Sequence, residues 1–298
     1  MTTTKVEQKE DPRRVALRQI AEATLETIKS GSYLNHDLAA SVAASKQNTR
    51  YYSPDSLLSA WAPSKSDTGP LTGQISLLEI STLEGARLLA TSHSSTECPK
   101  IGVLNFASAK KAGGGFLSGA QAQEESIARS STLYPTLMTR VAQSFYTLHN
   151  QNPKNGYYSH AMIYSPGVVV FRDDQGGWVE PLKVDVLTCA AVNAGVVRQA
   201  ISNITKAEKE EKIKKLMKER MARLLFLFEQ QGVKHLVLGS FGTGVFRNDV
   251  DVVVKIWCEL LLADNARFKK SFEHVVFAVL GRETFETFKQ IFSQYGHV

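Results

Sequence analysis

Short, almost wholly apolar runs that alternate with stretches of helical spacing constrain this chain more than any other feature. The runs lie at residues 75–81, 101–107, 161–173, 184–191, 235–241 and 272–280. A strand that is apolar on both sides has to be covered on both of its faces. The pattern therefore predicts the α/β class, with a sheet between two layers of helices.

Helix signals fill the intervals between these runs. The clearest helix is "PRRVALRQIAEATLETIKS", which Asp11 can cap, in which Pro12 occupies the first turn and which Gly31 follows. Further helices are expected at 83–92, over most of 121–138, and at about 205–231, 249–262 and 283–292.

The first quarter of the chain predicts a different organisation. Residues 46–73 are rich in Ser, Pro and Gly and predict an irregular arm on the main body. We expect residues 1–74 to form a helical extension packed on a core that comprises residues 75–298, the whole being one compact unit.

Charge and cysteine content restrict the class of protein. The net charge of +6 suits a polyanionic partner as well as an ordinary solvated surface. The Lys- and Glu-rich helix at 205–231 is interpreted as a solvent-facing amphipathic helix, so no direct nucleic-acid binding is expected. Three cysteines without a CxxC pair favour a reducing compartment, the cytoplasm or nucleus, over secretion, and argue against a structural zinc site. No run of residues predicts a membrane span or a signal peptide.

Two strands end in glycine-rich loops that lead towards helices. The first loop contains Gly113, Gly114 and Gly115, and the second contains Gly242 and Gly244. Glycine lets the backbone approach a ligand closely, and exposed amides at such turns bind phosphate. Either loop alone could be no more than a tight turn. Together, in an α/β protein whose ligands bind at the carboxyl ends of strands, they predict a nucleotide-type ligand held by its diphosphate.

Other nucleotide-binding signatures are missing from the sequence. There is no Walker-type phosphate loop, and "GSFGTG" is not the GxGxxG dinucleotide fingerprint. An NAD-dependent oxidoreductase would need that fingerprint and a proton-relay pair, and neither is evident.

Two adjacent acids, Glu124 and Glu125, stand near the start of the helix expected at 121–138. Neighbouring helical side chains point about 100° apart, so one acid can hold a sugar hydroxyl while the other faces a reacting bond. A carboxylic acid that protonates a leaving oxygen is central to glycoside hydrolysis. Because a helix N-terminus favours ionised acids, we expect a general acid here to be protonated only when a diphosphate is bound. The alternative is that both acids only complement the helix dipole.

The spacing of three glycines, seven residues and then "QEE" resembles the signature of the poly(ADP-ribose) glycohydrolases. "LNFASAKKAGGGFLSGAQAQEE" is most similar to the short, bacterial-type branch, which also occurs in filamentous fungi. "GSFGTGVFRND" resembles the second phosphate loop of that family, and "VDVLTCAAVNAG" and "SPGVVVFRDD" resemble its central strands. The resemblance covers residues 75 to about 285.

This resemblance implies a macrodomain-like three-layer α/β/α core with a mixed sheet and a helical N-terminal extension. It implies an enzyme that cleaves the ribose–ribose bond of poly(ADP-ribose), needs no metal or cofactor, and acts as a monomer. Its partners would be poly(ADP-ribose) and proteins that carry it, with ADP-ribose as the product.

The resemblance also assigns roles to residues. Glu125 would protonate the leaving ribose oxygen, after which water attacks an oxocarbenium-like sugar, while Glu124 and Gln123 would hold the sugars. The other expected substrate-binding residues are Gly113, Gly114, Gly115 and Phe116 on the first loop, Asn105 and Ser108 before it, and Gly242, Thr243, Gly244, Val245 and Phe246 on the second loop. Val245 would cap the terminal ribose, which implies cleavage mainly from the chain end.

Several positions depart from the family pattern. Ala112 stands where proline often precedes the triplet, Phe241 and Thr243 replace Trp and Cys, and Ser108 stands where macrodomains carry a sugar-binding Asn. Two further functions stay open: a non-catalytic macrodomain that binds ADP-ribose marks, and a hydrolase of single protein-linked ADP-ribose units. The intact "QEE" argues against the first.

Overall fold

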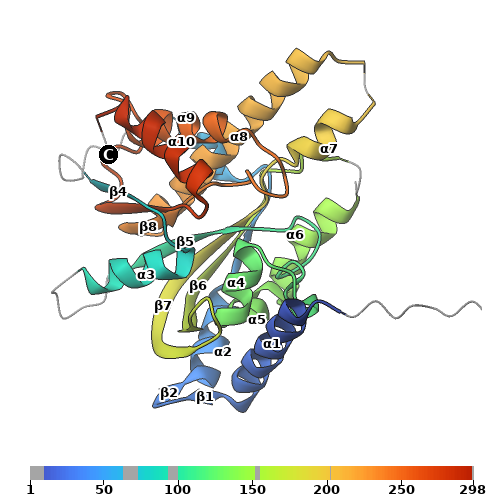
Figure 1. Ribbon diagram of the computed structural model, residues 1–298, viewed down its shortest axis with the longest axis vertical. Coiled ribbons are helices and arrows are strands. Elements are labelled where there is room, and N and C mark those ends of the chain that lie inside the picture. The colour runs from blue at the N-terminus through green and yellow to red at the C-terminus, as the bar shows by residue number, and fades with distance from the viewer. Residues whose placement is uncertain (1–9, 63–72, 93–99, 152–154, 202, 297–298) are drawn as a thin grey trace, which may run out of the picture.

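A seven-stranded mixed sheet forms the centre of the computed structural model, which describes residues 10–62, 73–92, 100–151, 155–201 and 203–296 (Figure 1). The strand order is β3-β6-β7-β5-β8-β9-β4. The five strands from β7 to β4 are parallel, β6 is antiparallel to β7, and β3 is antiparallel to β6. The strands are β3 (Arg50–Tyr52), β4 (Gln74–Leu78), β5 (Ile101–Phe106), β6 (Met162–Arg172), β7 (Trp178–Cys189), β8 (His235–Leu238) and β9 (His274–Ala278). A separate hairpin contains β1 (Ser32–Tyr33) and β2 (His36–Asp37).

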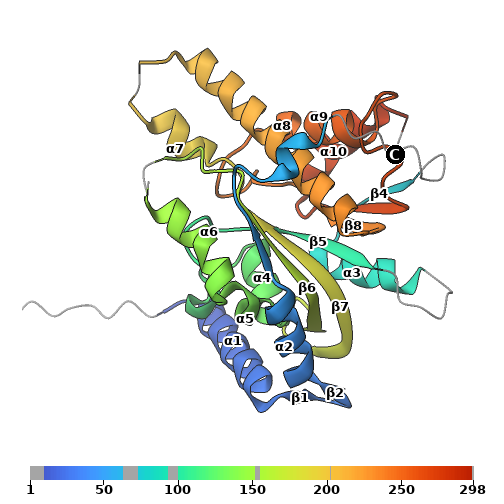
Figure 2. The ribbon, with the colours of Figure 1, turned by 180° about the vertical axis from the view of Figure 1, so that it is seen from behind.

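Helices cover both faces of the sheet, which confirms the three-layer prediction. The helices α8, α9 and α10 lie together on one side, and α1, α2, α4, α5 and α6 lie on the other (Figures 1 and 2). The helices are α1 (Pro12–Ser30), α2 (Leu38–Asn48), α3 (Thr82–Thr91), α4 (Gln123–Ser130), α5 (Leu133–Leu137), α6 (Arg140–Gln151), α7 (Ala194–Gln199), α8 (Lys206–Gln230), α9 (Val250–Leu261) and α10 (Arg282–Ser293), with 3₁₀ turns η1 (Leu57–Ala60) and η2 (Phe116–Ser118). Among the described residues, no helix is both long and apolar enough to span a bilayer.

The alternation of side chains along β5 shows why its sequence is apolar throughout. Val103 packs into the core beneath α3 to α6, whereas Leu104 packs into the core beneath α8 to α10. Gly102 faces the second core, where a Cβ atom would lie 2.7 Å from Cε1 of Phe228. A strand buried on both faces therefore reads as a continuous apolar run.

The expected irregular arm at 46–73 is wrong for its first part. The helix α2 extends to Asn48, and β3 pairs with β6 at the edge of the main sheet. Residues 63–72 of the arm lie outside the described residues. The strand β3 thus lies within the segment 1–74 that was expected to be only a helical extension.

The expected helix at 121–138 is two helices, because Ser131 is fully extended (φ −150°, ψ 175°) and forms an isolated bridge to Val170 of β6. The bridge ties the break between α4 and α5 to the sheet. The first of these helices, α4, begins at Gln123 and carries both glutamates in its first turn, near the helix start as predicted.

The charged helix α8 is solvent-facing only in its first half. A capping box of Thr205 and Glu208 starts it. Its second half is buried, and fully buried Arg220 donates from Nη1 to the carbonyl of Ala190 and from Nη2 to that of Tyr157, both at 2.9 Å. The guanidinium therefore supports the turn that follows β7. Cys189 and Cys258 are buried free thiols, and Cys98 lies outside the described residues.

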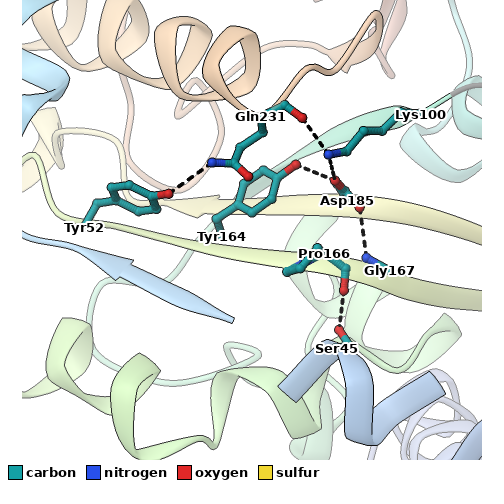
Figure 3. A network of polar contacts seen from close by, with 8 residues as sticks. All are labelled: Ser45, Tyr52, Lys100, Tyr164, Pro166, Gly167, Asp185 and Gln231. Atoms are coloured by element: carbon teal, nitrogen blue, oxygen red, sulfur yellow. Dashed lines mark hydrogen bonds and ion pairs between the residues drawn. The ribbon is translucent and has the colours of Figure 1, made fainter. Parts of the chain in front are cut away.

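A polar network closes the opposite end of β5 from the glycine loop (Figure 3). Asp185, paired with Gly102 of β5, accepts hydrogen bonds from the Tyr164 hydroxyl and, at 2.9 Å, from the amide of Gly167. Lys100 lies 3.2 Å from the same carboxylate and donates to the carbonyl of Gln231 at 2.6 Å. The network holds the β-bulge in β6, and its role is structural.

Candidate active site

The two glycine loops leave the same edge of the sheet. Since β5 and β8 are parallel neighbours, with Val103 opposite Val237, their carboxyl ends lie side by side. Between the loops is a cleft of ≈ 780 Å³. Its lining includes Phe106, Ser108, Lys111, Gly114, Gly115, Gln123, Glu124, Glu125, Asp174, Gly242, Gly244, Val245 and Phe246.

Gly114 is required by both its conformation and its surroundings. Its φ of +58° is left-handed, and an added Cβ would lie 2.2 Å from Oε1 of Glu125 and 3.1 Å from Oε2 of Glu124. Gly113 is also left-handed, at φ +67°. Glycine at these positions makes the turn and also admits both carboxyl groups to it.

Glu125 has one anchored and one open carboxyl oxygen. The amide of Gly115 donates to Oε1 at 2.8 Å. Within the described chain no group hydrogen-bonds to Oε2. Arg129, one turn further along α4, interacts electrostatically with this carboxyl group and donates to the carbonyl of Ala120 at 2.6 Å. The arrangement fixes the carboxyl group and leaves one oxygen for a ligand.

Glu124 is held more tightly and is only 2% exposed. The amide of Ser108 donates to its Oε2 at 2.7 Å and the amide nitrogen of Asn105 to its Oε1 at 3.3 Å. Burial raises the pKa of Glu124 to about 8, against these hydrogen bonds, and the neighbouring charge of Glu125 adds to the rise. The protein therefore favours the protonated form of Glu124 even without a substrate phosphate.

Gln123 clamps the start of α4 to the end of β5. Its Oε1 accepts from the amide of Phe106 at 2.8 Å, and its Nε2 donates to the carbonyl of Leu104 at 2.7 Å and to the hydroxyl of Thr82 at 3.2 Å. Both ends of the side chain are therefore engaged with the protein, although the residue lines the cleft.

The second loop presents several unpaired backbone amides. Gly242 has φ +76°, and a Cβ there would lie 2.4 Å from the Cβ of Ala191. Asn248 donates to the carbonyls of Gly242 at 2.9 Å and Val192 at 2.7 Å, which fixes the loop. Between residues 242 and 246, the amides of Gly242, Gly244, Val245 and Phe246 donate to no described group. Such a row of free donors suits an anion.

Aromatic and apolar side chains form one end of the cleft. The ring of Phe246 lines the cleft and packs on Tyr158, with centroids 5.8 Å apart. Val245 is 82% exposed at the tip of the loop.

Four of the residues expected to bind substrate do not line the cleft: Gly113, Asn105, Thr243 and Phe116. Phe116 is fully buried against Ala21 of α1 and Ala128 of α4, so its side chain lies in the core and not in the cleft. Asn105 hydrogen-bonds to Glu124, and Gly113 forms part of the turn. The hydroxyl of Thr243 donates to the carbonyl of Ser240 at 3.0 Å.

Sequence reasoning missed a third carboxyl group in the cleft. Asp174 follows β6 and accepts from the Ser81 hydroxyl at 2.5 Å, and burial raises its pKa. The signal was available in "FRDD", where two acids follow a buried strand. Nowhere in the described residues do three His, Cys, Asp or Glu side chains group as a metal site would require.

Comparison with known proteins identifies relatives of this fold and cleft. The family described as "Microbial-type PARG, catalytic domain" matches residues 21–173. The poly(ADP-ribose) glycohydrolase of Thermomonospora curvata is 36% identical, with 93% of this chain and 99% of that chain covered and a TM-score of 0.82. Its complex with the inhibitor ADP-HPD gives a TM-score of 0.80 at the same identity and coverage.

The poly(ADP-ribose) glycohydrolase of Deinococcus radiodurans, solved in complex with ADP-ribose, is a second relative. It is 34% identical, with 88% of this chain and 99% of that chain covered and a TM-score of 0.75. No curated protein matches the chain. This chain belongs to the microbial-type poly(ADP-ribose) glycohydrolases, because the family matches half of its sequence and nearly the full length of both solved chains is covered.

Proposed function

We propose that this protein hydrolyses the ribose–ribose bonds of poly(ADP-ribose), mainly from the chain end, and releases ADP-ribose. The observation that carries the proposal is the open Oε2 of Glu125 in a cleft that lies between two glycine loops. The cleft volume of ≈ 780 Å³ lies in the range of small-molecule sites.

The second loop is the proposed diphosphate site. The free amides from Gly242 to Phe246 would donate to phosphate oxygens, and the uncapped first turn of α4 would face the same charge. Because backbone amides supply these contacts, Thr243 can stand where relatives of this branch carry Cys. Phe246 would pack on the nucleoside, and exposed Val245 would close over the terminal ribose and leave no path for a longer chain.

Glu125 is the proposed general acid. Its Oε2 proton would pass to the bridging oxygen as the bond between that oxygen and the anomeric carbon breaks, which leaves an oxocarbenium-like ribose and a free hydroxyl on the shortened polymer. Water would then attack the anomeric carbon and lose a proton to the Glu125 carboxylate, which restores the acid. The hydrogen bond from Gly115 to Oε1 would keep Oε2 turned towards the substrate.

Glu124 and Gln123 would support this step in different ways. Glu124, held by Ser108 and Asn105, would bind the reacting ribose. Because its raised pKa favours the protonated form, it would not add its own negative charge to that of the Glu125 carboxylate. Gln123 would act as a positioning residue, because its amide already binds β5 and sets where α4 begins. No metal or cofactor enters this scheme.

The test is release of ADP-ribose from purified poly(ADP-ribose) by the wild type, Glu125→Gln and Glu125→Ala. We expect a loss of roughly 100-fold or more in both variants, the scale of a lost general acid, with the affinity for ADP-ribose retained. A wild type that binds ADP-ribose but releases none would instead be a non-catalytic ADP-ribose binder. A wild type that acts only on single protein-linked units would be a mono-ADP-ribosyl hydrolase.

A further inference from the structure

A groove continues from the cleft on the far side of the first glycine loop. Lys111 and Gly114 line both the cleft and a neighbouring hollow of ≈ 640 Å³ over α5 and α6. That hollow shares Tyr134 and Met138 with a second hollow beside α2, and shares Gln143, Thr147 and Gln151 with a third over α6. Of the helices over which these hollows lie, α5 contacts both α2 and α6, and all three lie on the same side of the sheet (Figures 1 and 2). We call the three hollows together the exit groove.

The exit groove carries positive charge and no lining acid. Its described lining includes Lys46, Lys110, Lys111 and Arg140, and neither Asp nor Glu. Lys46, Lys111 and Arg140 are exposed and form no ion pair with any described residue. A groove lined by one sign of charge concentrates ligands of the opposite sign. Its occupant is therefore expected to be a polyanion.

Tyr146 is a buried part of the groove wall, and its hydroxyl is shielded from solvent. The residue is 4% exposed and lines the hollow next to Gly114, and its hydroxyl has no hydrogen-bond partner among the described residues. Half-exposed Met138 and the ring of Tyr134 add a surface for a flat base.

We propose that the exit groove binds the ADP-ribose units that stay on the polymer after each cleavage. The inference rests on the proposed function, because it takes the terminal unit to lie in the cleft with its scissile bond at Glu125. The next unit must then leave past the Glu125 carboxyl group, and Gly114, which touches that group, is a shared wall of cleft and groove. Each unit brings two phosphates to a groove whose charged lining residues are all cations.

The experiment reverses two charges at the distal end of the groove, in Lys46→Glu/Arg140→Glu. Lys214→Glu/Lys289→Glu makes the same change in net charge on α8 and α10, away from the groove, and serves as the control. Release of ADP-ribose is measured from long poly(ADP-ribose) and from the two-unit oligomer, at low and high salt, together with the Kd of free ADP-ribose.

The groove variant is expected to lose about tenfold in kcat/KM on long polymer at low salt, since two contacts become repulsive. The loss should fade at high salt, and the values for the two-unit oligomer and for free ADP-ribose should stay within about twofold of wild type. Equal behaviour of groove and control variants on long polymer would overturn the proposal. A wild type that releases nothing from either substrate would instead refute the proposed function, which separates the two failures.

Discussion

Gly114→Ala is the sharpest test of how the glycine loop and the acids depend on each other. The new Cβ would stand 2.2 Å from Oε1 of Glu125, about 1 Å inside the van der Waals contact distance, so the carboxyl group has to move. A misplacement of about 1 Å at a catalytic group can cost on the order of 100-fold in rate. The left-handed φ of +58° adds a backbone cost of roughly 1–2 kcal/mol to the free energy of folding.

The control for backbone strain alone is Gly232→Ala. Gly232 has φ +69° and no atom within 4 Å of an added Cβ, so alanine there meets the same strain without a clash. Both variants should lose about 1–2 kcal/mol in urea denaturation. Only Gly114→Ala should also lose roughly 100-fold in ADP-ribose release. If folded Gly114→Ala keeps activity within a few-fold of Gly232→Ala, the close approach of the carboxyl group to the loop is not needed for catalysis.

Three further predictions follow from buried groups. The pKa of Glu124 is raised from 4.5 to about 8 in the folded state. Between these pH values the folded protein holds a proton that the unfolded chain releases, so the free energy of unfolding falls as pH rises. Glu124→Gln should remove up to a few kcal/mol of this fall, measured by denaturation at pH 5 and pH 8. Burial, and then the charge of Arg220, lowers the pKa of His149 from 6.5 to about 4. The unfolded chain therefore binds the proton first, and acidification from pH 7 to 5 should cost on the order of 2 kcal/mol that His149→Gln does not lose. Phe116→Ala should lower the free energy of unfolding by about 3–5 kcal/mol, and at low temperature the folded variant should still bind ADP-ribose. A variant that loses binding while its stability is unchanged would show that Phe116 contacts the substrate.

The order of strands and helices could be predicted wherever the signal was local. Buried strands on both faces gave continuous apolar runs, and α1 carried its cap, proline and terminal glycine in sequence. The strand β3 was missed because three residues show no periodicity, and its place depends on pairing with β6, more than one hundred residues away. The break between α4 and α5 depends on the bridge from Ser131 to Val170, which is also non-local.

The site could be predicted in its residue types and less well in their roles. Glycines and acids at one strand-to-helix junction indicated the cleft, and both loops line it. Phe116, adjacent to the glycines, gave no local sign that α1 would bury it. Packing alone determines two further features. Gln123 turns its amide back to β5, and the buried hydroxyl of Tyr146 has no described partner.

The contact of α1 with the first glycine loop and α4 bears on how the chain folds during its synthesis. Thr24 of α1 donates to the carbonyl of Arg129 at 2.6 Å, across 105 residues of sequence, and Ala21 covers Phe116. A chain that emerges from its N-terminus therefore exposes this helix long before α4 exists to receive it. During synthesis the inner face of α1 is exposed to water or covered by a chaperone until α4 is made. The loop that holds Glu125 takes its final shape only after α1 and α4 meet. The contacts that hold Glu125, the proposed general acid, are thus among the non-local ones, which form slowly.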